Sequence, residues 1–90
     1  MAICQMTDEL IRRETILLLM RARKLSARDV ERDLHFQHDY AHDELVFKYK
    51  DKVASIQVRD SERQLSIYQF SEQLLKPLVA ALAPLELVSQ

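Results

Sequence analysis

The sequence contains no glycine, although about six would be expected in a chain of this length at average usage. Glycine supplies positive φ angles and lets backbone approach a bound ligand closely. Without it the chain has no P-loop, no dinucleotide-binding fingerprint and no glycine oxyanion turn. This absence argues against several large enzyme classes. We therefore expect a non-enzymatic protein with no catalytic residues, no cofactor and no small-molecule substrate.

Cysteine is nearly absent as well. Cys4 is the only one, so no intrachain disulfide can form. That usage is typical of proteins in a reducing compartment, and we expect a cytoplasmic protein. The apolar run Ile16–Met20 is far shorter than the ~20 residues that a membrane span needs, so no membrane association is expected.

Charge of one sign is also lacking, because 13 basic and 14 acidic residues give a net charge of −1. There is no global attraction to nucleic acid, and any such role must rest on a local patch. With 48% hydrophobic and 30% charged residues, the composition is that of one globular domain covering residues 1–90. Residues 1–6 are expected to fray.

Two helices are predicted in the first third of the chain. Thr7 is a good N-cap for a helix over residues 10–25, which is apolar on more than one side and should pack centrally. Ser26 caps a second, amphipathic helix that ends near His35. Its apolar face carries Ala27, Val30 and Leu34.

Residues 36–53 are undecided between helix and strand. The spacing of Tyr40, Leu45 and Tyr49 is helical, whereas residues 45–50 partly alternate as a strand would. A hairpin here would need Asp51-Lys52 as its two-residue turn, which is poor chemistry for positive φ. We therefore favour a helix from about His38 to Lys50.

The next segments predict a hairpin and a last helix. Residues 53–59 and 64–70 alternate and should pair around a polar turn at 60–63. Ser71 can cap a helix that restarts at Pro77. The predicted fold is α+β, with three N-terminal helices, a β-hairpin and a kinked C-terminal helix. The alternative is a set of helices flanking a three-stranded antiparallel meander.

This order of elements resembles a winged helix-turn-helix domain over residues 8–70. Residues 25–34 look like the second helix of that family, residues 35–37 like its turn, and residues 60–63 like the tip of its wing. The resemblance implies DNA binding, with residues 38–50 as the recognition helix. The basic residues it would use on phosphates are His38, His42, Lys48, Lys50, Lys52, Arg59 and Arg63.

The same segment departs from the family because it carries Asp39, Asp43 and Glu44, and carboxylates are repelled by phosphates. The alternative function is therefore an adaptor or inhibitor whose acidic residues dock on a protein partner. A DNA-binding regulator should gather its lysines and arginines on one face, clear of Asp39 and Asp43. Residues 53–82 are also similar to the hairpin-then-helix of small phage head-completion proteins, which implies an assembly role.

The tail, residues 71–90, is apolar to its end. So small a domain can hardly bury all of it, so we predict a homodimer formed partly through this tail, with folding back over the first helix as the rival. The candidate dimerisation residues are Leu78, Val79, Leu82, Leu85 and Leu87.

Three histidines raise the question of a metal. On one continuous helix, His35, His38 and His42 would share a face, and imidazoles one turn apart can bind zinc. However, Asp39 stands where the similar metalloprotease helix has glutamate, and its shorter arm would place a base badly. We expect solvent-facing histidines and no metal.

Overall fold

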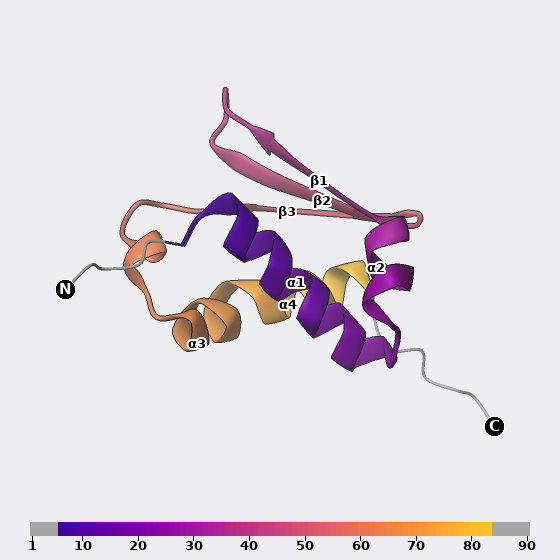
Figure 1. Cartoon of the computed structure of the whole chain (residues 1–90). Helices are drawn as coiled ribbons and strands as arrows, with labels where there is room; N and C mark the ends of the chain where they lie inside the picture. Colours follow the sequence, from indigo (N-terminus) through magenta and orange to yellow (C-terminus); the bar gives the residue numbers. More distant parts are fainter. Residues whose placement is uncertain (1–5, 84–90) are drawn as a thin grey trace.

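The structure of the chain is a computed structural model that describes residues 6–83, and it has an α+β fold (Figure 1). Two helices come first, then three strands, then a helical C-terminal segment. The elements are α1 (Asp8–Arg23), α2 (Ala27–Asp33), β1 (Leu34–Asp39), β2 (Glu44–Tyr49), β3 (Lys52–Gln57), η1 (Glu62–Gln64), α3 (Ile67–Phe70), η2 (Ser71–Leu75) and α4 (Lys76–Leu82). Within these residues no helix is long and apolar enough to cross a lipid bilayer.

The strands form one antiparallel meander in the order β1-β2-β3, and the helices cover one of its faces (Figure 1). Successive side chains of a strand point to opposite faces. In β2, Leu45, Phe47 and Tyr49 are buried toward the helices, while Lys48 is exposed on the outer face. Phe47 is aligned with Phe36 of β1 and Ala54 of β3, which sets the register.

Helix α1 is the centre of the packing, as its many-sided apolar pattern predicts. It contacts α2, β1, η2 and α4. Ile11 and Leu19 are fully buried, and burying one such side chain contributes about 1.5–3 kcal/mol. Thr15 is the one buried polar side chain in the described core, and its hydroxyl donates to the Ile11 carbonyl at 2.8 Å. Its burial therefore costs little.

The helix predicted from His38 to Lys50 was wrong, because these residues belong to β1, a turn and β2. This segment carries both helical spacing and strand alternation, and it forms a strand because alternate residues of β2 are buried against the helices. The two-residue turn is Lys50-Asp51, not Asp51-Lys52, since Tyr49 pairs with Lys52. Lys50 takes a positive φ of 55°, so the turn forms without glycine.

The predicted hairpin of residues 53–59 with 64–70 was also wrong. The first strand exists as β3, but it pairs with β2. Residues 64–70 contain the end of η1 and helix α3, which Ser66 caps in a capping box with Gln69. Ser71 is therefore inside the helical segment and is not its cap. The layout found is the alternative, helices flanking a three-stranded meander.

The C-terminal helix, which we define as α3, η2 and α4 together, contains a π-helical turn at η2. Within that turn the Lys76 amide donates to the Ser71 carbonyl, five residues back. Pro77 follows directly, in the first turn of α4, and has no N–H to donate to the preceding helical turn. The sequence pattern predicts a kink or a restart at Pro77, but α4 begins at Lys76 and the chain is helical without a break from Ile67 to Leu82, so no separate helix restarts there.

The helix starts predicted at Thr7 and Ser26 are confirmed. The Thr7 hydroxyl accepts from the Leu10 amide and the Ser26 hydroxyl from the Asp29 amide, each at 3.2 Å. Helix α2 ends at Asp33, two residues before the predicted end. Fraying of residues 1–6 was wrong for Met6, which is buried, and residues 1–5 lie outside the described part of the chain.

Within residues 6–83 three non-glycine residues lie in the left-handed region, where a Cβ is unfavourable. They are Lys24 at φ 53°, Asp43 at φ 50° and Lys50 at φ 55°. Lys24 ends α1 with ψ 47°, and its amide donates to the Met20 carbonyl. Helices commonly place glycine in this conformation at their ends.

We predict that Lys24→Gly raises the free energy of unfolding by about 1 kcal/mol, because it removes the left-handed Cβ clash. Lys48→Gly, the same change within β2, should lower it by about 0.5–1 kcal/mol. Urea denaturation of both variants measures the difference. An equal loss of stability in the two variants would contradict a left-handed Lys24.

Candidate functional site

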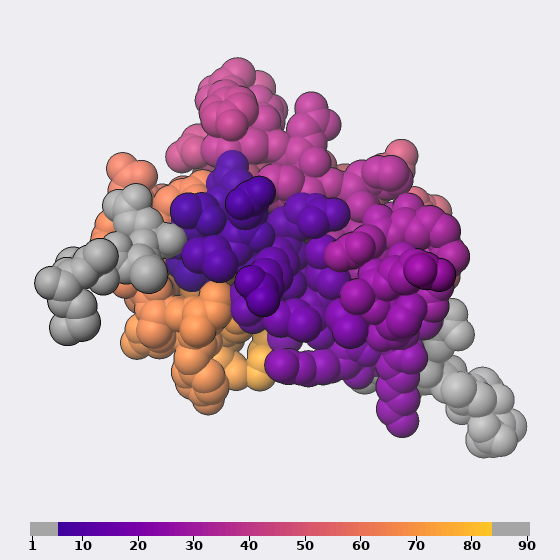
Figure 2. All heavy atoms as spheres, in the orientation of Figure 1, coloured from indigo at the N-terminus to yellow at the C-terminus, as the bar shows by residue number. Residues whose placement is uncertain are grey.

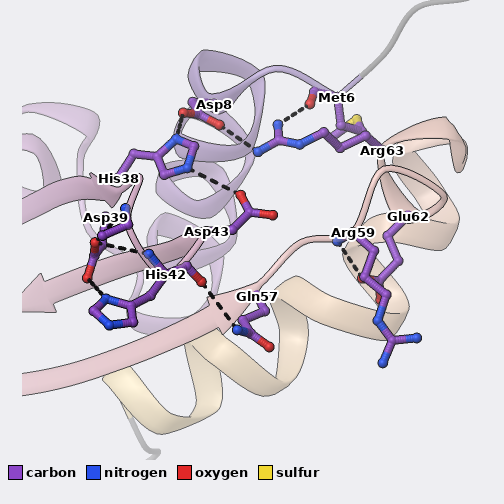
Figure 3. Close-up of polar contacts among 11 residues, drawn as sticks. Met6, Asp8, His38, Asp39, His42, Asp43, Gln57, Arg59, Glu62 and Arg63 are labelled. Atoms are coloured by element: carbon purple, nitrogen blue, oxygen red, sulfur yellow. Dashed lines mark hydrogen bonds and ion pairs between the residues drawn. The ribbon is translucent and has the colours of Figure 1, made fainter.

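Polar side chains from four elements meet where α1 begins (Figure 3). The Asp8 carboxylate lies 2.6 Å from His38 Nδ1 and 2.9 Å from an Arg63 guanidinium nitrogen. Arg63 also donates to the Met6 carbonyl at 2.6 Å, and the Met6 amide donates back to the Arg63 carbonyl. His38 Nε2 lies 3.5 Å from Asp43. We call Met6, Asp8, His38, Asp43 and Arg63 the Asp8 network.

The carboxylate of Asp8 is the shared acceptor of this network. Partial burial alone would raise its pKa, but hydrogen bonds from His38 and Arg63, with their charges, outweigh burial and hold the pKa below its ordinary value. The partners lie 30 and 55 residues away in the sequence. The network therefore fastens the start of α1 to β1 and to η1.

His38 is held between two carboxylates. Both ring nitrogens face carboxylates, those of Asp8 and Asp43, and the ring stacks on Tyr40 with centroids 4.0 Å apart. The two carboxylates lie on opposite sides of the ring, and within residues 6–83 no group of three or more metal-ligating side chains is assembled.

A second histidine belongs to the β1–β2 turn. His42 Nδ1 lies 2.9 Å from the Asp39 carboxylate, which also accepts from the Ala41 and His42 amides. The hydrogen bond to Asp39 raises the pKa of His42, and the same bond lowers the pKa of Asp39. Gln57 of β3 donates to the His42 carbonyl at 3.3 Å (Figure 3). These contacts are local turn chemistry.

The seven predicted DNA-contacting residues do not form one surface. Lys48, Lys50 and Lys52 lie at the β2–β3 turn, and Lys50 sits 5.7 Å from the Tyr49 ring. The other four lie at the opposite end of the sheet, about 17 Å away for six-residue strands at ~3.3 Å per residue. These four are His38, His42, Arg59 and Arg63. Except for Arg59, their side chains are paired with carboxylates or a backbone carbonyl.

The predicted acidic partner-binding residues do come together, at the β1–β2 turn. Asp39 and Glu44 are aligned across the first two strands, and Asp43 lies between them in the turn. Asp39 is engaged by His42 and Asp43 by His38. They are therefore mixed with the basic residues at that end of the sheet.

The predicted dimerisation residues divide in two. Leu78, Val79 and Leu82 are buried in the chain's own core, at 3%, 5% and 1% exposure. This much of the tail packs on the same chain, which was the rival prediction, and a small part of Val79 still reaches the surface, where it lines a groove. Leu85 and Leu87 lie outside the described residues.

A groove that the sequence reasoning missed runs between α1 and α4. Its volume is about 620 Å³, and Figure 2 shows a hollow where the surface of α1 meets that of the C-terminal helix. Apolar side chains line most of it, and its two charged lining residues are both cations. The lining residues are Leu18, Arg21, Ala22, Lys76, Val79, Ala80 and Ala83.

Two other grooves differ in their charge or their size. The one beside α1 and α2, about 750 Å³, is lined by Glu9 and Glu31 as well as Arg12 and Arg13, so its charges are mixed. The one between β3 and α4 is smaller, about 250 Å³. The β3–α4 groove has no charged lining residue, and the α1–α4 groove is the larger of the two mainly apolar grooves and the one whose charged lining residues have a single sign.

A signal for this groove does exist in the sequence. Leu18 and Ala22 are spaced i, i+4 on a helix that is apolar on several sides, and Val79 and Ala83 repeat that spacing on α4. The sequence does not show that these two stripes face each other. The Asp8 network was missed for the same reason, since Asp8 and Arg63 are 55 residues apart.

Comparison with known proteins found no match: no protein-family model fits the chain, and neither a curated protein nor a solved structure resembles it.

We predict that Asp8→Asn lowers the free energy of unfolding near neutral pH by about 1–3 kcal/mol, because charge-assisted hydrogen bonds are lost. The folded-state pKa of Asp8 lies below its ordinary value of 3.8. Its contribution is therefore complete above that value and is lost as pH falls through the folded pKa. The gap between wild type and variant should be constant above about pH 5 and close at lower pH.

Urea titrations across this pH range measure the gap. The matched control is Asp60→Asn, an exposed aspartate without a described side-chain contact, which should change stability little at any pH. A gap for Asp8→Asn that does not narrow on acidification would show that the carboxylate charge stabilises nothing.

Proposed function

We propose that this protein is a small non-enzymatic adaptor or inhibitor that binds another protein by docking an apolar segment in the α1–α4 groove. The observation that carries the proposal is the composition of that groove. Leu18, Ala22 and Val79 line it together with other apolar side chains, and no acid does. Exposed apolar grooves between helices commonly receive an amphipathic helix from a partner.

The size of the groove suits a helical segment. On α4 the lining residues extend from Lys76 to Ala83, and on α1 from Leu18 to Ala22. Seven residues of helix rise about 10 Å, or two turns. A partner helix packed along this length would contact the groove through side chains at i, i+3 or i+4, and i+7.

The charge arrangement favours protein binding over DNA binding. A phosphate grip needs several cations along one face, because each neutralised phosphate adds to affinity. Here the seven predicted DNA-contacting residues are split between the two ends of the sheet, and Asp39 and Asp43 are mixed among those at one end. The segment expected to enter the major groove, residues 38–50, forms strands and a turn.

The surroundings of the histidines favour a non-enzymatic protein. His38 and His42 are held by Asp8 and Asp39, and their contacts are explained by the turn and the network they stabilise. Neither nitrogen of His38 faces a hydroxyl or thiol among the described residues. Binding a partner segment in a groove needs no catalytic base.

Selection of peptides from a random library displayed on phage, with the full chain as bait, tests this function. Ala80→Glu places a charge in the groove, and Ala81→Glu makes the same change one residue along, at an exposed position that lines the smaller β3–α4 groove instead. We expect selected peptides to lose at least tenfold in affinity for Ala80→Glu and less than threefold for Ala81→Glu. That tenfold loss is about 1.4 kcal/mol.

A second experiment tests DNA binding by titrating the full chain with random duplex DNA at salt concentrations from low to physiological. We expect no binding, because a phosphate grip is strongest at low salt. Failure to select any peptide, or an equal loss of peptide affinity in Ala80→Glu and Ala81→Glu, would overturn groove docking. Salt-sensitive duplex binding that Lys50→Ala and Lys52→Ala weaken would replace it with the DNA-binding function.

A further inference from the structure

The two charged residues of the α1–α4 groove are Arg21 on α1 and Lys76 on α4, so each wall carries one cation. Arg21 is exposed and has no polar partner among the residues the structure describes. Lys76 pairs with Glu72 one turn back, and this hydrogen bond raises the pKa of Lys76. Glu72 does not line the groove, but its carboxylate offsets part of the Lys76 charge, so Arg21 is the stronger cation facing an occupant and Lys76 the weaker one.

The positive potential continues beyond one end of the groove. Ala83 lines both the groove and a neighbouring pocket of about 420 Å³ at the β2–β3 turn. That pocket is lined by Arg23, Lys50 and Lys52, with Asp51 as its one acid. A segment lying along the groove and past Ala83 would therefore pass from one set of cations to the next.

We propose that the partner segment is an acidic amphipathic helix, with apolar side chains in the groove and carboxylates on both flanks. This inference rests on the proposed function and names the chemistry of its ligand. Flanking Glu or Asp would face Arg21 on one side and Lys76 on the other. The end of the segment that passes Ala83 would carry further acid, facing Lys50 and Lys52.

Charge complementarity decides between acidic and basic helices because the apolar contacts are the same for both. A basic flank would place like charges beside Arg21 and Lys76, and like-charge juxtaposition costs affinity and slows encounter. The exposed position of both cations makes the preference depend on ionic strength. It should be strongest at low salt and weaken as salt is added.

The test uses two synthetic peptides of about 16 residues, roughly four helical turns, with identical leucine positions. One carries glutamate and the other lysine at the flanking positions, and fluorescence anisotropy measures their binding to the full chain at low salt. We expect the glutamate peptide to bind at least tenfold more tightly. The double variant Arg21→Glu with Lys76→Glu should reverse the preference.

The matched control is Arg28→Glu with Arg59→Glu, which changes net charge equally at exposed positions outside the groove. It should keep the preference for the glutamate peptide. Circular dichroism checks that each variant folds. If the double variant does not fold, Arg21→Glu alone replaces it and should at least halve the preference for the glutamate peptide.

The inference is overturned by equal binding of the two peptides, by preference for the lysine peptide, by no binding of either, or by a control that loses the preference as the groove variant does. The proposed function is judged separately by the library-selected peptides. If those bind and are lost on Ala80→Glu while the synthetic pair shows no preference for acid, the docking groove stands and its acidic ligand does not.

Discussion

The burial of alternate side chains of β2 against the helices is the constraint on which the rest of the structure depends. Leu45, Phe47 and Tyr49 all point to the same face, and a slip of one residue would put Lys48 into the core instead. With β2 fixed, the registers of β1 and β3 follow from the aligned pairs on either side. The sheet then covers one side of the helices and leaves the α1–α4 groove on another.

The Asp8 network holds together the end of the domain where α1 begins, and the register of the sheet places His38 there. Aligning His38 with Leu45 turns the imidazole toward the helical face, where Asp8 begins α1. Arg63 reaches the same carboxylate from the segment after the sheet. One carboxylate thus joins three parts of the chain.

Local features could be predicted from the sequence, and features that depend on distant residues could not. The caps at Thr7 and Ser26 and the central position of α1 each follow from a few neighbouring residues. Residues 38–50 carry helical spacing and strand alternation at once, so only the burial of Phe47 under distant helices decides between them.

In the candidate site, too, the residue types can be predicted from the sequence and their relative positions cannot. Basic residues such as Lys48 and Arg63 are visible in the sequence, but their positions at opposite ends of the sheet are not. The α1–α4 groove is made by two helices separated by more than fifty residues, and each contributes an unremarkable apolar stripe. No sequence rule pairs Leu18 with Val79 before the fold is known.

The proposed function rests on what the packing leaves exposed, an apolar groove with one cationic side chain on each wall. The most direct measurement is backbone amide chemical-shift mapping of the isotope-labelled full chain during titration with a selected peptide. The largest shifts should fall on Leu18, Ala22, Val79 and Ala80. Shifts concentrated instead on the β1–β2 turn or on the outer face of the sheet around Val53 would contradict the groove as the binding surface.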